Sequence, residues 1–453
     1  MGLRTTDRLT LIRQRQIRRR DGAAKWAIGW LGLLAMLGFF APWVASSVPW
    51  WVKVDGKSYW PLLNPSEQIF LRENPDQTSP LPIYPIQAMW PSQGVEAAWL
   101  AWVPYGVNGR AEDAPKLAPG TPYQRTNVGL AQAYPIQYRH WLGTDKQGRD
   151  VLALLIHGIR SSLGIALIAA SLTWCLGIVI GGLAGYLQTQ PSRLSRRELL
   201  LLLTLAGMVW FWGWKVWQPW LATRGFMLRS FWLLGLLVGS MAVLRLIRPK
   251  FAQLGLTWTP RDKPLKGSIG TWLDRLIEVL DALPSLLLLF ILLAFLDRNQ
   301  SRMGLMLFLS LIGWTGVARL ARGEILALVK APFIESAQAL GYTRVRIFWH
   351  HLLPNIWPTL LVLWVILVGN MLLVESTLSF LALADGSPPS WGGMLGAAAG
   401  DTTYWWLSLS PGLMIFVTVL ALNFLAEWYQ DKINRGEDGR TQNPKKKKWL
   451  LGA

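Results

Sequence analysis

Four long uncharged runs constrain the fold of this chain more than any other feature of its sequence. They cover residues 26–48, 161–190, 354–374 and 402–426. Each reaches the roughly 20 apolar residues that a helix needs to cross the hydrocarbon core of a bilayer. Four shorter uncharged runs lie at 199–214, 230–244, 282–296 and 303–318. Each is flanked by charged residues whose long side chains can reach the membrane interface. With 52% hydrophobic and 16% charged residues, the chain is predicted to be an all-α polytopic membrane protein with eight spans.

The distribution of charge predicts the side of the membrane on which each loop lies, because Lys and Arg concentrate in cytoplasmic loops. The basic segments are 1–25, 193–197, 245–266, 319–346 and 432–448. Eight crossings then leave both termini in the cytoplasm, with Arg224 and Arg229 as exceptions to the rule. The run 26–48 exceeds the roughly 7 to 15 residues of a signal-peptide core, so it is predicted to be retained. The net charge of +19 thus reflects topology and does not indicate nucleic-acid binding.

These features divide the chain into seven predicted segments. They are a basic cytoplasmic N-terminus (1–25), a first transmembrane helix (26–48), a Pro-rich periplasmic loop (49–139), a periplasmic amphipathic helix with the second transmembrane helix (140–190), an insert with two transmembrane helices (191–265), a core (266–430) and a basic cytoplasmic tail (431–453). The core includes a cytoplasmic loop, 321–355. The Pro-rich loop has little helical periodicity, and it is either an extended connection or a contact surface for a partner.

A polar motif at the end of the Pro-rich loop predicts a helix start. Thr144 followed by Gln147 fits a capping box, in which the Thr oxygen accepts from the amide three residues on. Asp145 adds a negative charge to the same turn, where the helix dipole favours it. We therefore expect a short amphipathic helix that begins at Thr144, lies on the outer membrane surface and leads into the second span. An ordinary capped helix start without further function explains these residues equally well.

A polar, basic stretch lies between two apolar spans at 332–355. A short helix is predicted from Glu335 to Leu340, with Ala337 and Ala339 as a small-residue surface for close approach. Gly341 can adopt the left-handed conformation that ends a helix, and a basic amphipathic helix is predicted from Tyr342 to His351. Pro354 then marks the entry into the next span. Such a loop is either a docking surface or a simple connector.

The sequence has no Cys/His metal spacing, phosphate-binding glycine loop or nucleophile elbow, and is predicted to be non-enzymatic. Its most unusual membrane residue is Glu375, near the outer end of an apolar run. Because an ionisable group at membrane depth is costly, it counts as a functional-site hypothesis. The alternatives are a residue of the pore or gate and a buried hydrogen bond to a neighbouring helix.

Three motifs together resemble one family of proteins. The stretch His140 to Leu163 is similar to the LGTDxxGRDxxxxxxxGxxxSL signature of the second permease subunit in dipeptide, oligopeptide and nickel importers of the ATP-binding-cassette superfamily. The loop 332–355 resembles the EAA loop of binding-protein-dependent permeases, with Ser336 and Leu352 as departures. The stretch from Glu375 to Leu395 resembles the ExxLSFLG and PSWGxML patterns of the same subunit. The resemblance covers about 25–48, 139–188 and 266–436.

The resemblance implies the fold and partners of a type I importer permease, with six core helices and here about two more. It implies a bacterial inner-membrane location, a second homologous permease, two ATPase subunits and a periplasmic or lipid-anchored solute-binding protein. ATP and Mg would be used by the ATPases, with no cofactor or metal bound by this chain. Peptides are the favoured cargo; nickel or another small solute is the alternative, and a channel or ion-coupled carrier is less favoured.

The resemblance also implies three groups of site residues. The group coupled to the ATPase is Glu335, Ser336, Ala337, Ala339, Gly341, Arg346, His351 and Pro354. The periplasmic motif is Gly143, Thr144, Asp145, Gly148, Arg149 and Asp150. The residues of the pathway or gate are Glu375, Ser379, Phe380 and Trp391.

Overall fold

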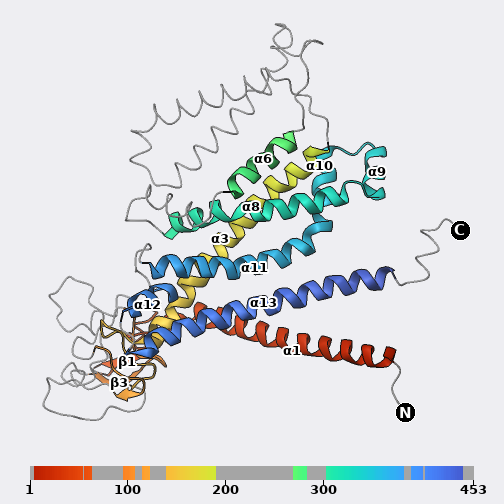
Figure 1. Cartoon of the computed structure of the whole chain (residues 1–453). Helices are drawn as coiled ribbons and strands as arrows, with labels where there is room; N and C mark the ends of the chain where they lie inside the picture. Colours follow the sequence, from red (N-terminus) through yellow and green to blue (C-terminus); the bar gives the residue numbers. More distant parts are fainter. Residues whose placement is uncertain are drawn as a thin grey trace, which may run out of the picture. The chain divides into compact units, whose positions relative to one another are not determined.

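The computed structural model describes residues 5–54, 56–63, 95–107, 115–122, 139–189, 269–282, 302–381, 389–400 and 403–441, and these are mostly helical, as predicted (Figure 1). The helices are α1 (Thr5–Phe39), α2 (Ala41–Val44), α3 (Val151–Gln188), α6 (Ile269–Asp281), α8 (Arg302–Leu328), α9 (Pro332–Ala339), α10 (Arg344–Ile347), the π-helical turn η4 (Phe348–Leu352), α11 (Leu353–Phe380), α12 (Trp391–Ala398) and α13 (Trp405–Thr441).

Four helical stretches of the described residues are long and apolar enough to cross a membrane. They are Arg20–Phe39, Val151–Gln188, Arg344–Phe380 and Trp405–Arg435, one for each of the four long runs in the sequence. The shorter run 303–318 lies within α8, which has 27 residues and is therefore about 40 Å long. The predicted spans at 199–214, 230–244 and most of 282–296 lie outside the described residues, as does the insert 191–265.

The ends of the first and last spans differ from the prediction. Helix α1 begins at Thr5, inside the segment that was predicted as a basic N-terminus, and ends at Phe39, well before residue 48. The single turn α2, with a proline in its first two positions, follows at once. Helix α13 continues to Thr441, through part of the predicted tail. Charge composition identified the spans, but it could not distinguish a loop from a polar continuation of the same helix.

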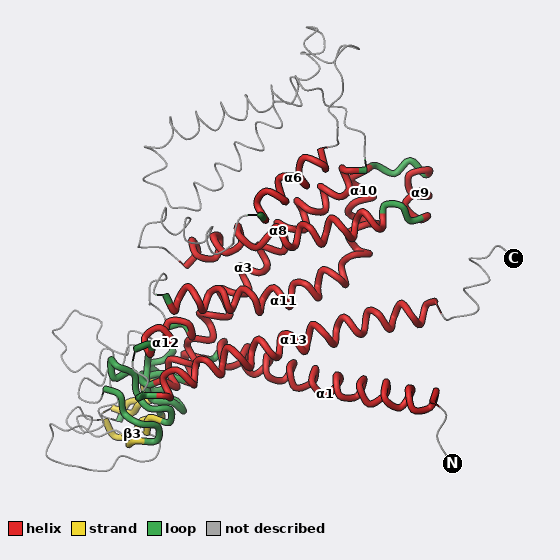
Figure 2. The backbone as a smooth tube through the Cα atoms, viewed as in Figure 1, coloured by secondary structure: helices red, strands yellow, loops and turns green. Residues whose placement is uncertain are grey.

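Short strands, which the sequence did not predict, occur in the Pro-rich segment (Figure 2). Strand β1 (Trp51–Val54) pairs antiparallel with β2 (Lys57–Tyr59) and with β3 (Val95–Trp99), giving the order β2-β1-β3. Strands β4 (Thr121–Pro122) and β5 (Arg139–His140) form a second pair. The segment is thus partly ordered by backbone hydrogen bonds between distant residues.

The described residues form two compact units. One comprises those up to Val179, Asp281–Ala318 and those from Trp349 on, and the other comprises those in Ile180–Leu280 and Arg319–Phe348. In the first unit α1 runs antiparallel to α13: Trp30 Nε1 donates to Thr418 Oγ1 at 3.4 Å, and Trp428 Nε1 donates to Asp21 at 3.0 Å. An Arg20–Asp431 ion pair closes one end.

Glycines allow close helix contacts within each unit. In the first unit a Cβ on Gly177 of α3 would lie 2.5 Å from Val317 of α8. In the second unit a Cβ on Gly270 of α6 would lie 2.2 Å from a backbone oxygen of α3. Arg322 of α8 joins the same cluster through Asp274 at 2.7 Å. The predicted helices therefore pack through small residues rather than through large interlocking side chains alone.

Candidate functional site

The loop between α8 and α11 is built around a glycine-terminated helix. Helix α9 ends with Gly341 at φ +75°, the left-handed conformation that the sequence predicted. The amide of Gly341 donates to the carbonyl of Gln338 at 2.9 Å, and the amide of Tyr342 donates to that of Ala337 at 3.2 Å. This is the hydrogen-bond pattern of a Schellman cap. The chain reverses here because glycine carries no Cβ that would oppose a positive φ.

Helix α9 has one buried face and one exposed face. Ile334 and Ala337 are buried within their own unit, whereas Glu335, Ser336 and Ala339 are exposed. Of the two alanines predicted as a surface for close approach, Ala337, at position i+3 from Ile334, packs inward, and Ala339 lies on the outer face. The large exposed apolar side chains between α8 and α11 are Phe333, Leu340, Val345 and Trp349.

The second helix of the loop begins at Arg344, after an N-cap at Thr343, whose hydroxyl accepts from the amide of Arg346 at 3.4 Å. Arg346 also stacks on the ring of Tyr342, 4.3 Å from its centroid. Helices α10, η4 and α11 follow one another without a break, so Pro354 lies in the first turn of α11, as predicted. His351 accepts from Asn355 through its carbonyl at 2.6 Å. Helical backbone thus runs from the loop into an apolar span.

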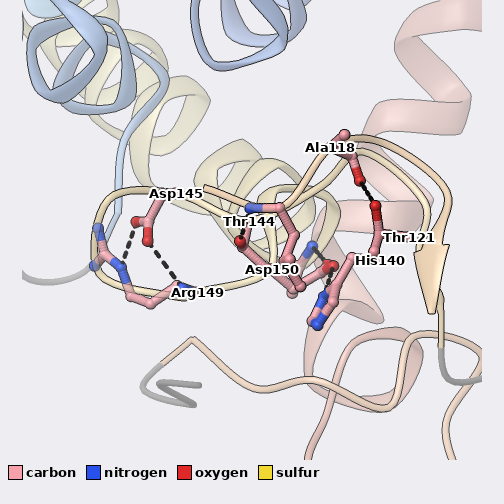
Figure 3. Close-up of polar contacts among 9 residues, drawn as sticks. Ala118, Thr121, His140, Thr144, Asp145, Arg149 and Asp150 are labelled. Atoms are coloured by element: carbon pink, nitrogen blue, oxygen red, sulfur yellow. Dashed lines mark hydrogen bonds and ion pairs between the residues drawn. The ribbon is translucent and has the colours of Figure 1, made fainter. Parts of the chain in front are cut away.

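The motif at 143–150 folds into a turn, not into a helix (Figure 3). Thr144 does not form the predicted capping box: its hydroxyl accepts from the amide of Leu117 at 2.7 Å. Asp145 instead accepts from the amides of Gln147 and Arg149, each at 2.8 Å, and pairs with the Arg149 side chain at 2.7 Å. The prediction of a surface helix from Thr144 is wrong because these side chains close a loop on themselves and on a distant strand connection.

Asp150 is the residue that caps the following helix. Its carboxylate accepts from the amide of Ala153 at 2.8 Å, and α3 begins at Val151. The same carboxylate is hydrogen bonded to Nδ1 of His140 at 2.9 Å, and the His140 ring stacks on Tyr105. The side chains of His140 and Asp150 are each about 1% exposed. Five of the six residues of the predicted motif are therefore buried, and Arg149 is partly exposed.

Two glycines make the turn possible. Gly143 and Gly148 have φ +76° and +73°, where a side chain would strain the backbone. A Cβ on Gly143 would also lie 2.3 Å from the carbonyl oxygen of Leu117. Both glycines of the predicted motif are thus required by the turn itself.

Glu375 is fully buried in a cluster of hydroxyl groups. Ser379 donates to its carboxylate at 2.9 Å and Ser376 at 3.4 Å. The hydroxyls of Ser162 of α3 and of Ser390, the N-cap of α12, lie close to the same carboxylate. Both hydrogen bonds of Glu375 come from serines of its own helix, α11, while Ser162 and Ser390 bring α3 and α12 close to the same carboxylate.

Trp391 locks α12 onto the same cluster. It is fully buried, its amide donates to Ser162 at 3.0 Å, and its indole donates to the carbonyl of Leu155 at 3.1 Å. Glycines admit this packing, since a Cβ on Gly158 would lie 2.8 Å from the indole and one on Gly392 would lie 2.3 Å from the Ser376 carbonyl oxygen. No shift of α12 is possible without breaking several of these contacts.

The structure brings Glu375, Ser379 and Trp391 together as one site, whereas the Phe380 side chain is largely exposed and does not belong to it. The sequence did not predict that Ser162 and Ser390 lie beside Glu375. Ser162 lies in the motif His140 to Leu163 and Ser390 lies in the motif Glu375 to Leu395, and this was the only sign in the sequence of a role for them.

Comparison with known proteins finds a family model that matches part of the chain. Residues 254–438 match the family described as binding-protein-dependent transport system inner membrane component. The chain is 25% identical over 306 residues to the dipeptide transport system permease protein DppC of Bacillus subtilis, covering 67% of this chain and 71% of DppC. It is 32% identical over 172 residues to the oligopeptide transport system permease protein OppC of Escherichia coli K12, covering 37% of this chain and 56% of OppC. It is 25% identical to the glutathione transport system permease protein GsiD of Pectobacterium atrosepticum, over 69% of this chain and 76% of GsiD.

Proposed function

We propose that this chain, whose residues 254–438 match the family described as binding-protein-dependent transport system inner membrane component, is the transmembrane permease subunit of an ATP-driven importer. The loop from α9 to α10 receives the motion of a cytoplasmic ATPase, and the spans convert that motion into alternating access. The chain supplies no catalytic group. ATP and Mg²⁺ belong to the partner ATPases.

One observation carries this proposal: the exposed loop continues without a break into a membrane span. Leu340 is 72% exposed and Val345 is 67% exposed, although both are large apolar side chains on a short loop. Contiguous exposed apolar groups of this kind commonly indicate a protein contact. Because α10, η4 and α11 are consecutive helical segments, a partner that displaces α10 acts directly on the span. Rigid secondary elements carry coupling between distant sites in this way.

The cluster around Glu375 is the other end of this mechanism. It fixes α12 and α3 to the last turns of α11, so that a movement of α11 carries α12 with it. We assign Glu375, Ser379 and Trp391 to the fastening of a gate element rather than to direct contact with cargo. Hydrogen bonds of Trp391 join α12 to α3, and Gly392 of α12 packs against Ser376 of α11, which supports this role.

The remaining partners follow from the family. A second homologous permease completes the pathway, each permease takes one ATPase, and a periplasmic or lipid-anchored binding protein delivers the cargo to the outer face. Both termini lie in the cytoplasm of a bacterium, because the basic segments favour that side. The named relatives transport dipeptides, oligopeptides and glutathione. Peptides are accordingly the proposed cargo.

Two matched substitutions test the coupling loop. Leu340→Asp places a charge on the exposed face of the loop, and Leu63→Asp does the same at a leucine of comparable exposure, 62%, in the Pro-rich segment. Neither side chain supports the core, so both variants are expected to insert normally. Affinity purification of the tagged chain with its partners should lose the ATPases only for Leu340→Asp. Retention of the ATPases by that variant, with normal uptake, would contradict the proposal.

The cargo is tested separately. Vesicles that contain the complete transporter and its binding protein should accumulate labelled dipeptides and oligopeptides in an ATP-dependent manner, and should not accumulate nickel. ATP-dependent nickel uptake without peptide uptake would reassign the cargo while leaving the coupling proposal intact.

A further inference from the structure

Large aromatic side chains are exposed where α1 ends and on the small sheet that follows it. We name as the aromatic patch the residues Phe39, Phe40, Trp43, Trp99 and Trp102. Trp102 is 81% exposed and Phe39 is 76% exposed, values that are unusual for side chains of this size. Ala101 and Val103, on either side of Trp102, are buried, so Trp102 points away from the fold. Patches of this kind indicate a contact with protein or membrane.

Hydrogen bonds fix the sheet to the end of the helix. The indole of Trp50 donates to the carbonyl of Trp43 at 2.7 Å, and the amide of Trp50 donates to the carbonyl of Trp99 at 2.8 Å. Near Trp102, the amide of Val103 donates to the carbonyl of Val44 at 3.0 Å. Trp99 and Trp102 therefore lie within a few residues of hydrogen bonds to α2 or to Trp50, and their position along the membrane normal follows from that of α2.

The depth of α2 can be derived from the span before it. Arg20–Phe39 has 20 residues and is therefore about 30 Å long, which is the thickness of the hydrocarbon core. Arg20 forms an ion pair with Asp431 at one end, so Phe39 lies at the opposite boundary of the hydrocarbon. Phe40 and Trp43, in the next turn, then fall in the headgroup layer.

Helix α13 gives an independent estimate of the same level. Trp30 is bonded to Thr418 across the antiparallel pair. Trp43 lies 13 residues after Trp30, and Trp405 lies 13 residues before Thr418, so the two tryptophans lie at about the same height. Trp405 is the first residue of α13 and is also exposed. Tryptophan is enriched at membrane–water interfaces, where its ring lies among the headgroups.

We infer that the aromatic patch rests in the headgroup layer of the bilayer and holds the β1–β3 sheet against the membrane surface. Its occupant is phospholipid, because the patch is continuous with the end of a span and level with the tryptophan that starts another. Lys57, at the far end of the β1–β2 hairpin from Trp51, faces water. This inference goes beyond transport: it needs neither an ATPase nor a cargo, and the failure of either would leave it unaffected.

The test uses the full-length chain in vesicles of phosphatidylethanolamine and phosphatidylglycerol. Cys175 is the single cysteine and is replaced by serine, so that Trp102→Cys, Lys57→Cys and Val345→Cys can each be labelled with the fluorophore NBD. All three positions are exposed, so the labels should not disturb the fold. The Trp102 label should emit at shorter wavelength and be quenched several-fold more by lipids with a nitroxide near the headgroup than by aqueous iodide. The other two labels should show the reverse.

A Trp102 label that iodide quenches as strongly as it quenches the Lys57 label would overturn the inference. So would a label that is protected only after a solute-binding protein is added, since the patch would then be a protein-docking surface. A second variant covers a disturbance caused by the probe: with the label at Trp99→Cys, Trp102→Glu should reduce quenching by lipid nitroxide, whereas Trp102→Phe should preserve it. Equal quenching in both would also refute the lipid contact.

Discussion

Replacing Gly341 by valine should disable coupling without affecting membrane insertion. Gly341 has φ +75°, and a Cβ built on it meets no atom within 4 Å, so the whole effect arises from the backbone. A left-handed conformation costs an L-residue roughly 1–2 kcal/mol, and a β-branched side chain is a genuine outlier there. If the docked form of the loop needs this conformation, its population falls by a factor of about 5–30. ATP-driven uptake should fall by the same factor.

The measurement is initial uptake by vesicles that contain the complete transporter, normalised to the amount of inserted chain. Gly341→Asn is the first control, because asparagine tolerates the left-handed region, and it should retain most of the activity. Gly323→Val is the second: that glycine lies in α8, has a helical backbone and also faces open space, so uptake should be normal. The reasoning is refuted if Gly341→Val transports normally, or if the asparagine variant is as inactive as the valine variant.

Three further predictions concern stability, measured as the thermal midpoint of the purified chain in size-exclusion chromatography. Gly392→Ala should lower the midpoint, because its Cβ would lie 2.3 Å from the Ser376 carbonyl oxygen and overpacking costs about 1–3 kcal/mol. As a control, Gly393→Ala should have little effect, because the atom nearest to its Cβ is the Ser390 hydroxyl at 3.3 Å. Glu375→Gln should preserve both the midpoint and uptake, because an amide can accept from and donate to the surrounding hydroxyls, whereas Glu375→Leu should lose about 1–3 kcal/mol for each stranded hydroxyl. Asp150→Ala should lose about 1 kcal/mol for the helix cap and more for the stranded His140; an unchanged midpoint would contradict the buried role of this carboxylate.

The long spans and the coupling loop could be predicted because their signals are local. Twenty uncharged residues in a row have few alternatives to a membrane helix. In the same way, Gly341 ends α9 and Pro354 begins α11 through conformational preferences that act within one turn. The face of α9 that turns inward is a different matter. The i, i+3 spacing of Ile334 and Ala337 places both on one face of α9, but only the folded structure shows that this face is buried and that Ala339 is exposed.

The turn at 143–150 shows how a local pattern can mislead. Thr144 and Gln147 have the spacing of a capping box, but the hydroxyl of Thr144 meets the amide of Leu117, 27 residues away. The true cap is Asp150, a residue type that is common at N-caps, and its second partner is His140 on the other side of the turn. The strands have the same origin: Trp51–Val54 is short, and its partner Val95–Trp99 is some forty residues distant. Tertiary partners, not propensity, selected these structures.

The three motifs differ in what explains them, and that difference bears on function. The polar groups of the turn at 143–150 bind one another, and its backbone angles require its glycines. The structure of the turn therefore explains the residues of this motif without a partner. The same holds for the Glu375 cluster, in which serines, Trp391 and Gly392 complete one another's contacts. Helix α9 and its cap are explained only in part. Ile334, Ala337 and Gly341 are used by the fold, whereas Glu335, Leu340 and Val345 lie exposed. When some residues of a motif have no role in its fold, contact with a partner is the best explanation for them. The loop, rather than the more buried motifs, is therefore the place at which to test coupling.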